Sequence, residues 1–137
     1  MPGYTQPTTP SLSWGENFDA LLEFLREPEL GPTLLSPNRF TKAFGMDLKT
    51  LARQARVHRN TVSQSPGSES VQQFIRNVLR VLRAAIDVSG DVGRATFWYR
   101  NEPLPPFDYK TAEALVSEGR TEEVLRYVVS LNAGAAG

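Results

Sequence analysis

The residue types that carry out acid-base, nucleophilic and metal chemistry are scarce in this sequence. Its 137 residues include no cysteine and one histidine, His58, which excludes thiol nucleophiles, disulfides and paired-histidine metal sites. A lone histidine could serve a hydrolytic triad only with a serine nucleophile, and the sequence contains no nucleophile-elbow motif. The adjacent Glu122 and Glu123 would point about 100° apart on a helix, which suits a helix start better than paired catalysis. We therefore expect a protein that is not an enzyme and that needs no cofactor or metal.

The most informative chemistry lies in residues 47–64, DLKTLARQARVHRNTVSQ. Ala52, Val57 and Val62 recur at intervals of five residues, as the packing of a helix-turn-helix requires. The positions around them carry side chains that bind phosphates or base edges in the major groove. These candidate DNA-binding residues are Lys49, Arg53, Arg56, His58, Arg59, Asn60, Thr61, Ser63 and Gln64. Asn60 and Gln64 are suited to reading adenine, whereas Lys49 and Arg53 are suited to contacting the DNA backbone.

The same residues have an alternative interpretation, which is a helix pair within a bundle that touches no DNA. Two departures from the usual pattern favour this alternative. Arg56 stands where many such turns have glycine, and Pro66 limits the second helix to about two turns.

The distribution of charge favours a basic binding face. The chain is formally neutral, with 15 Lys+Arg and 15 Asp+Glu, and 40% of its residues are hydrophobic. This ordinary composition excludes a polybasic or a wholly disordered chain. The charges are nevertheless segregated: residues 1–38 carry −4, 39–59 carry +5, 60–100 carry +2 and 101–137 carry −3. The basic excess thus coincides with the predicted DNA-binding segment.

Helical periodicity surrounds this segment, and no stretch alternates at the period of two that a strand requires. The sequence therefore predicts an all-α fold. The expected helix starts are Ser13 with Glu16 in capping-box spacing, Ser36 before Pro37, and Asp47. The longest apolar stripe, from Glu69 to about Asp87, contains no glycine or proline and predicts a central helix of about five turns.

Three further helices are expected beyond Gly90. Asp91 begins a helix that runs through Arg100, and a proline-rich loop covers 101–107. A short helix then ends at Gly119, and Thr121 is expected to cap the last helix. The predicted buried face of this helix comprises Val124, Leu125, Val128 and Leu131, and its tail, 133–137, is expected to fray.

The second half of the chain carries a family resemblance. The run FWYRNEPLPPFDYKTAEALVSEGRTEEVLRYVVSLNAG, together with the degenerate helix-turn-helix, resembles the Xre/MbcA/ParS antitoxins of RES-type toxin-antitoxin pairs. The shared features are a tryptophan-containing helix, a proline-bearing loop, a Lys-Thr helix start, and a glycine before a final Val/Leu helix. Here they are Trp98, residues 101–104, Lys110 with Thr111, Gly119, and Val124 with Leu125. The chain departs from the family at Phe107, Asp108 and Tyr109, where Leu-Gly-Gly is frequent, and at Ala112, where proline is frequent.

The resemblance implies an antitoxin that blocks the active site of a RES-domain toxin, an NAD-consuming enzyme. It also implies an N-terminal domain that binds the promoter of its operon, with a homodimer inside a larger toxin-antitoxin complex. We expect the helix and tail from Arg120 onward to enter or cover the toxin cleft. The expected toxin-binding residues are Trp98, Arg100, Lys110, Arg120, Arg126, Tyr127, Leu131 and Asn132. Core packing is an equal alternative for Trp98.

The expected organisation has three parts: a flexible arm at 1–12, an Xre-like helix-turn-helix module at 13–88, and a toxin-binding helical domain at 89–137. The first residues lack the features of a signal peptide, and no apolar run reaches the ~18 residues of a membrane span. A cytoplasmic protein that does not bind membranes is therefore expected. Two other functions stay open, namely a stand-alone helix-turn-helix transcription regulator without an enzyme partner, and an all-α adaptor whose helix-turn-helix is vestigial.

Overall fold

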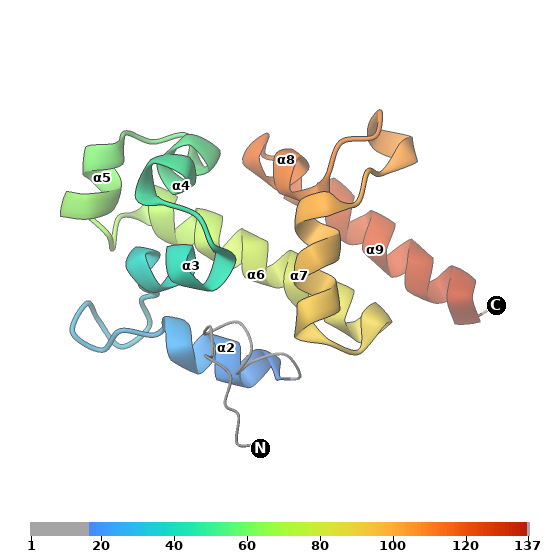
Figure 1. Ribbon diagram of the computed structural model, residues 1–137, viewed down its shortest axis with the longest axis horizontal. Coiled ribbons are helices and arrows are strands. Elements are labelled where there is room, and N and C mark those ends of the chain that lie inside the picture. Colours follow the sequence, from blue (N-terminus) through green and yellow to red (C-terminus); the bar gives the residue numbers. More distant parts are fainter. Residues whose placement is uncertain (1–16, 137) are drawn as a thin grey trace, which may run out of the picture.

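The computed structural model describes residues 17–136, which form helices and connecting loops (Figure 1). The predicted all-α class is confirmed for this part of the chain, where the strand-like pairings are two isolated bridges, Arg26 with Leu35 and Leu104 with Lys110. The predicted arm at 1–12 and the capping box at Ser13 and Glu16 lie outside the described residues. In chain order, the elements are α2 (Phe18–Leu25), α3 (Pro37–Phe44), α4 (Leu48–Ala55), α5 (Arg59–Gln64), α6 (Glu69–Ser89), α7 (Val92–Asn101), the 3-10 helix η1 (Pro105–Phe107), α8 (Ala112–Ser117) and α9 (Thr121–Ala136).

Capping side chains set the ends of the first described helices. Asn17 Oδ1 accepts hydrogen bonds from the N–H groups of Asp19 and Ala20 at the start of α2. Ser36 Oγ accepts the N–H of Arg39 at 3.1 Å, and Pro37 follows at the first helical position of α3. Gly45 ends α3 with a φ of 66°, a left-handed conformation that glycine adopts without steric cost. The boundaries predicted for this helix at Ser36, Pro37 and Gly45 are confirmed.

Helix α6 is the central element, as its long apolar stripe predicted. It contacts α3, α4, α7, α8 and α9, and it runs through the middle of the molecule in Figure 1. Val71, Ile75, Val78 and Leu82 are fully buried along it. Burying each such side chain contributes roughly 1.5–3 kcal/mol, so this stripe holds helices from both halves of the chain.

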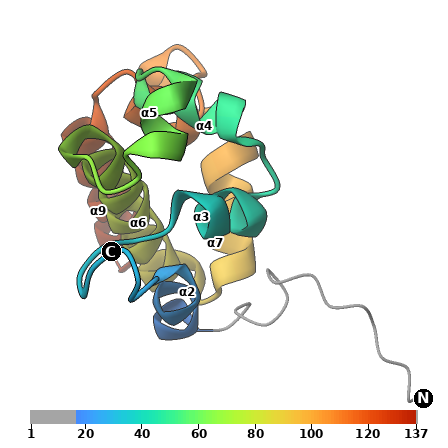
Figure 2. The same cartoon turned by 90° about the vertical axis from the view of Figure 1, so that its left-hand side faces the viewer.

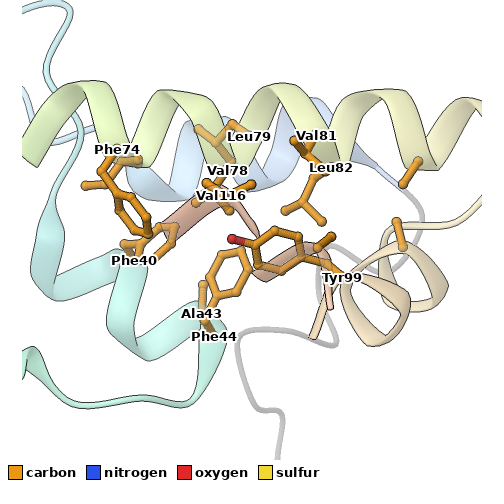
Figure 3. Packing of buried hydrophobic residues seen from close by; sticks show 14 of the residues in the cluster. Phe40, Ala43, Phe44, Phe74, Val78, Leu79, Val81, Leu82, Tyr99 and Val116 are labelled. Carbon is orange, nitrogen blue, oxygen red and sulfur yellow. The ribbon is translucent and has the colours of Figure 1, made fainter. Parts of the chain in front are cut away.

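Aromatic rings fill the space where α3, α6 and α7 meet (Figure 3). Phe40 stacks on Phe44 with ring centroids 4.4 Å apart, and Phe74 meets the edge of Phe40 at 6.4 Å. Tyr99 of α7 contacts Phe44 edge-to-face at 6.4 Å. Among the described residues the buried Tyr99 hydroxyl has no hydrogen-bond partner, and its burial raises the pKa of Tyr99 well above the ordinary value. Aromatic packing therefore dominates this junction.

A buried glutamine joins the loop before α3 to the start of α6. Gln72 is 1% exposed. Its Oε1 accepts the N–H of Leu35 at 2.9 Å, and its Nε2 donates to the carbonyls of Leu35 and Pro66 at 2.8 Å each. The Gln72 side chain thus supplies hydrogen-bond partners to backbone groups in two loops, which lie outside the helices and have no helical hydrogen bonds of their own.

Three expectations about the last helix are wrong. Thr121 does not cap α9, because it is the first helical residue and its buried hydroxyl has no hydrogen-bond partner among the described residues. Instead the N–H of Val124 donates to the carbonyl of Arg120 at 3.2 Å. Leu131 is 37% exposed rather than buried, and it lies at the apolar hollow beside Val88 and Ser89, where α6 ends. The helix also continues to Ala136 instead of fraying; alanine, the strongest helix former, stands on both sides of Gly134.

None of the helices between residues 17 and 136 combines the length and hydrophobicity that a membrane crossing requires.

Candidate nucleic-acid and protein interfaces

Helices α4 and α5 hold the predicted DNA-binding residues against the body of the molecule. Asp47 caps α4, with its Oδ1 accepting the N–H of Thr50 at 2.8 Å, and this hydrogen bonding lowers the pKa of Asp47. Ala52 and Val62 are buried at 3% and 2% exposure, and Val57 between them is half-buried. The residues spaced at five therefore face inward, and they fix how α5 lies on α4.

Most of the predicted DNA contacts lie on the solvent side of this helix pair. Thr61 is half-buried, and α5 ends at Gln64, just before Pro66, as predicted. Arg53 and Arg59 form no ion pair with any residue that the structure describes. The exposed members are Lys49, Arg53, Arg56, His58, Arg59, Asn60, Ser63 and Gln64. We define the α4–α5 surface as the side chains of Lys49, Arg53, His58, Arg59, Asn60, Thr61, Ser63 and Gln64.

Arg56 differs from the other candidates because its side chain is bound within the protein. Its backbone has a φ of 60°, which is unfavourable for a residue other than glycine. Its Nε donates to the carbonyl of Ser117 at the end of α8 at 2.7 Å, and Ser117 Oγ donates to the carbonyl of Gln54 at 2.8 Å. We call these three residues the α4–α8 junction. It ties the turn between α4 and α5 to a helix about 60 residues further along the chain.

Trp98 lies half-buried beside a small apolar hollow, which the last turns of α6 form together with residues of α7 and α9. The hollow has a volume of about 130 Å³ and is lined by Ala85, Val88, Ser89, Ala95, Trp98, Val128 and Leu131. Val88 and Leu131 are exposed at its edge, at 42% and 37%. Val129 on α9 is 62% exposed. This end of the molecule therefore presents apolar side chains to solvent, which is typical of a protein-binding surface.

Two of the predicted toxin-binding cations, Arg100 and Lys110, pair with other groups of the protein. Arg100 donates to the carbonyl of Phe44, and its Nε lies 3.2 Å from Glu113 Oε2. Lys110 Nζ lies 2.9 Å from Glu118, and this hydrogen bond lowers the pKa of Glu118. Arg100 thus links α7 to α8, and Lys110 links the residues before and after α8.

Arg120, Arg126, Tyr127 and Asn132 lie along the start and outer face of α9. Arg120 Nη2 lies 2.9 Å from Glu123 Oε1, a hydrogen bond that raises the pKa of Arg120, and its guanidinium lies 5.3 Å from the Phe107 ring centroid. Tyr127 is half-buried, with its ring edge-on to Phe107 at 5.8 Å. Arg126 and Asn132 are exposed, so these two side chains are accessible to a partner.

Two exposed aromatic residues were missed as candidates. Phe97 is 66% exposed on α7, and Tyr109 is 68% exposed in the loop before α8. Helical spacing provides the signal for Phe97, because it falls off the stripe of Val92, Ala95 and Tyr99, which are all buried. No comparable signal marks Tyr109, because its exposure depends on the loop conformation.

These features define an all-α protein with an exposed basic helix pair at one end and exposed apolar and aromatic side chains at the other (Figure 1). Comparison of the chain with protein-family models, with curated proteins and with solved structures gave no match.

Proposed function

We propose that the protein is an antitoxin of the Xre/MbcA/ParS type, which neutralises a RES-domain NAD-degrading toxin and represses its operon. The backbone at Asp108 and Tyr109 carries this proposal. Both residues have left-handed conformations, with φ values of 57° and 65°. The antitoxins often have Leu-Gly-Gly at Phe107–Tyr109, and glycine is the residue that adopts such φ values at no steric cost. The chain thus keeps a glycine-type loop conformation without the glycines, which supports a shared loop structure.

The exposed apolar side chains of α7 and α9 support the toxin-binding half of the proposal. Trp98 and Leu131 line the apolar hollow, and Phe97 and Val129 are exposed on the same two helices. Large apolar and aromatic side chains supply most of the binding energy of protein interfaces. Residues 101–137 carry a net charge of −3, which complements a basic pocket that handles a dinucleotide. In the proposed mechanism α9 and its tail cover the toxin cleft and prevent the entry of NAD.

Point substitutions on the exposed face of α9 test this mechanism best. Removal of α9 would also expose the core that Val124 and Val128 fill, so loss of function would not distinguish binding from folding. We expect Val129→Asp to abolish co-purification with the toxin encoded by the neighbouring gene and to leave the melting temperature nearly unchanged. Ser70→Asp, which adds the same group to an exposed position on α6, serves as the control. Undiminished toxin neutralisation by the Val129→Asp variant would contradict the proposal.

The α4–α5 surface supports the DNA-binding half. It combines the exposed cations Lys49, Arg53 and Arg59 with the exposed amides Asn60 and Gln64, and these groups bind phosphates and adenine edges respectively. A dimer would place two such surfaces on the promoter, with on the order of 6 to 10 phosphate contacts. Binding should then weaken with salt at a slope of about −0.9 per contact in a plot of log K against log salt concentration.

Matched substitutions separate the two kinds of DNA contact. Arg53→Ala should weaken binding to all sequences alike, whereas Asn60→Ala should relax the preference for the operator. Arg94→Ala on α7, an exposed arginine away from the surface, is the control for the loss of charge. A salt-independent affinity, or the absence of a promoter shift with the purified complex, would refute DNA binding. Promoter binding by a protein that captures no toxin would instead favour a stand-alone regulator.

A further inference from the structure

A shallow groove on α6 shares no lining residue with the α4–α5 surface or with the apolar hollow beside Trp98. It lies between α2 and α9 on α6, and its volume is about 660 Å³. Apolar side chains form most of the exposed surface inside it, and none of its described lining residues is acidic. Its apolar residues are Phe18, Leu22, Leu35, Leu79 and Leu125, and its polar residues are Gln73, Arg76, Arg80 and Arg83. Figure 2 shows α2 and α9 on two sides of α6.

The polar residues of the groove form one stripe along α6. Gln73, Arg76, Arg80 and Arg83 follow one another at steps of three and four residues, which places them on one face of the helix. The stripe carries three positive charges beside the apolar floor. The groove is therefore amphipathic along its length, with a basic edge supplied by α6.

The three cations are only weakly neutralised by the protein itself. Arg83 lies over the ring of Phe18 at 5.2 Å and forms no ion pair with the described residues. Arg76 lies 4.0 Å from Glu69, whose side chain is 86% exposed. Arg80 and Glu122 are 2.8 Å apart but are exposed at 48% and 65%. Solvent-exposed pairs of this kind contribute little, so all three guanidinium groups remain accessible to an incoming carboxylate.

We propose that this groove binds an amphipathic helix of a partner protein that carries Asp or Glu beside its apolar stripe. The lining from Gln73 to Arg83 spans about 15 Å at 1.5 Å per residue, the length of about three helical turns. An apolar groove of this length with charge along one edge suits helix-in-groove recognition. The acidic helix of this chain, α2, cannot supply the same helix from a second copy, because Leu21 and Leu25 of its apolar face are buried within the protein.

A synthetic helix tests the proposal with the full-length protein. The probe is a fluorescein-labelled peptide of about 12 residues, with Leu at positions i, i+3, i+4 and i+7 and Glu on both flanks. A second peptide has Lys in place of every Glu. We expect saturable binding of the Glu peptide by fluorescence anisotropy, at least tenfold weaker binding of the Lys peptide, and affinity that falls as salt is raised.

Variants of the protein locate the binding site. Arg83→Glu should weaken binding of the Glu peptide roughly tenfold, and Arg83→Gln roughly threefold, in keeping with a long-range charge contribution. Arg94→Glu makes the same charge change on α7 and should have no effect. Circular dichroism melts confirm that each variant is folded. If Arg83→Glu does not fold, the affinity of Arg83→Gln for the Glu peptide tests the proposal.

Three results would overturn the proposal. The first is absence of binding, and the second is binding that both Arg83 variants leave unchanged. The third is self-association of the protein that Arg83→Gln abolishes, because the groove would then be an interface between two copies of the chain. Since the groove shares no residue with the proposed DNA-binding and toxin-binding surfaces, its failure would leave the antitoxin proposal intact.

Discussion

From the α4–α8 junction we predict how two replacements of Arg56 change the free energy of unfolding. In the protein, Arg56 combines an unfavourable φ of 60° with a hydrogen bond from its Nε to the carbonyl of Ser117. The left-handed conformation costs roughly 1–2 kcal/mol for a residue with a Cβ atom. A hydrogen bond from a charged group contributes about 1.5–3 kcal/mol, and the lower end applies here because the Arg56 side chain is exposed.

Replacement by alanine and by glycine separates these two contributions. Arg56→Ala loses the hydrogen bond and keeps the backbone strain, so we expect the free energy of unfolding to fall by about 1.5 kcal/mol. Arg56→Gly loses the same hydrogen bond but relieves the strain, so its free energy of unfolding should lie within about 0.5 kcal/mol of that of the native protein. The glycine variant should therefore be more stable than the alanine variant by about 1 kcal/mol.

Urea unfolding followed by circular dichroism measures both differences. In thermal melts, 1 kcal/mol corresponds to a shift of about 4 °C for a chain of this size. Gln64→Ala and Gln64→Gly, at an exposed residue of helix α5, form the control pair, in which alanine should be the more stable. If Arg56→Gly is no more stable than Arg56→Ala, the left-handed backbone at residue 56 imposes no cost in free energy, which would refute the prediction.

Three further predictions concern buried and paired groups. Gln72→Leu should lower the free energy of unfolding by about 3 kcal/mol in urea titrations, because it leaves the buried backbone groups of Leu35 and the part-buried carbonyl of Pro66 unpaired; a loss below about 1 kcal/mol would contradict this. Tyr99→Phe should leave that free energy unchanged or raise it by up to about 1 kcal/mol, because it removes a buried hydroxyl without a partner, whereas a clear loss would show that the hydroxyl has one. The pKa of Glu118 is lowered by its hydrogen bond to Lys110, so stability from this pair should be constant above pH 4.5, the ordinary value for glutamate, and should decline as the pH falls below it. Lys110→Met should reduce that decline in melts recorded from pH 7 to 3, and an identical decline would argue against the pair.

Local signals in the sequence predicted most of the helices. Ser36, Asp47 and Asp91 all cap helices where their residue types indicated, because an N-cap depends on neighbours within three residues. The stripe of α6 was equally predictable, since a helix with one buried face must repeat its apolar residues at helical spacing. The prediction that Thr121 caps α9 was wrong because its hydroxyl is buried in the protein. That burial depends on tertiary packing rather than on local sequence.

The candidate surfaces were only partly predictable for a related reason. Exposure of Arg53 and Asn60 follows from their place off the buried faces of short helices, which Ala52 and Val62 mark. The binding of Arg56 to Ser117 could not be foreseen, because it joins residues far apart in the chain. The groove on α6 likewise requires α2 and α9 to lie on either side of it, an arrangement that no single helix specifies.

The central position of α6 has a consequence for synthesis of the chain on the ribosome. Translation proceeds from the N-terminus, so α6 is made before α7, α8 and α9, which cover much of its apolar stripe. A nascent chain that ends near Gly90 therefore exposes Val78, Val81 and Leu82, and such transient apolar surfaces favour aggregation. A pause in translation shortly after α6 would prolong that exposure, whereas rapid synthesis of α7, α8 and α9 would bury the stripe within the same molecule.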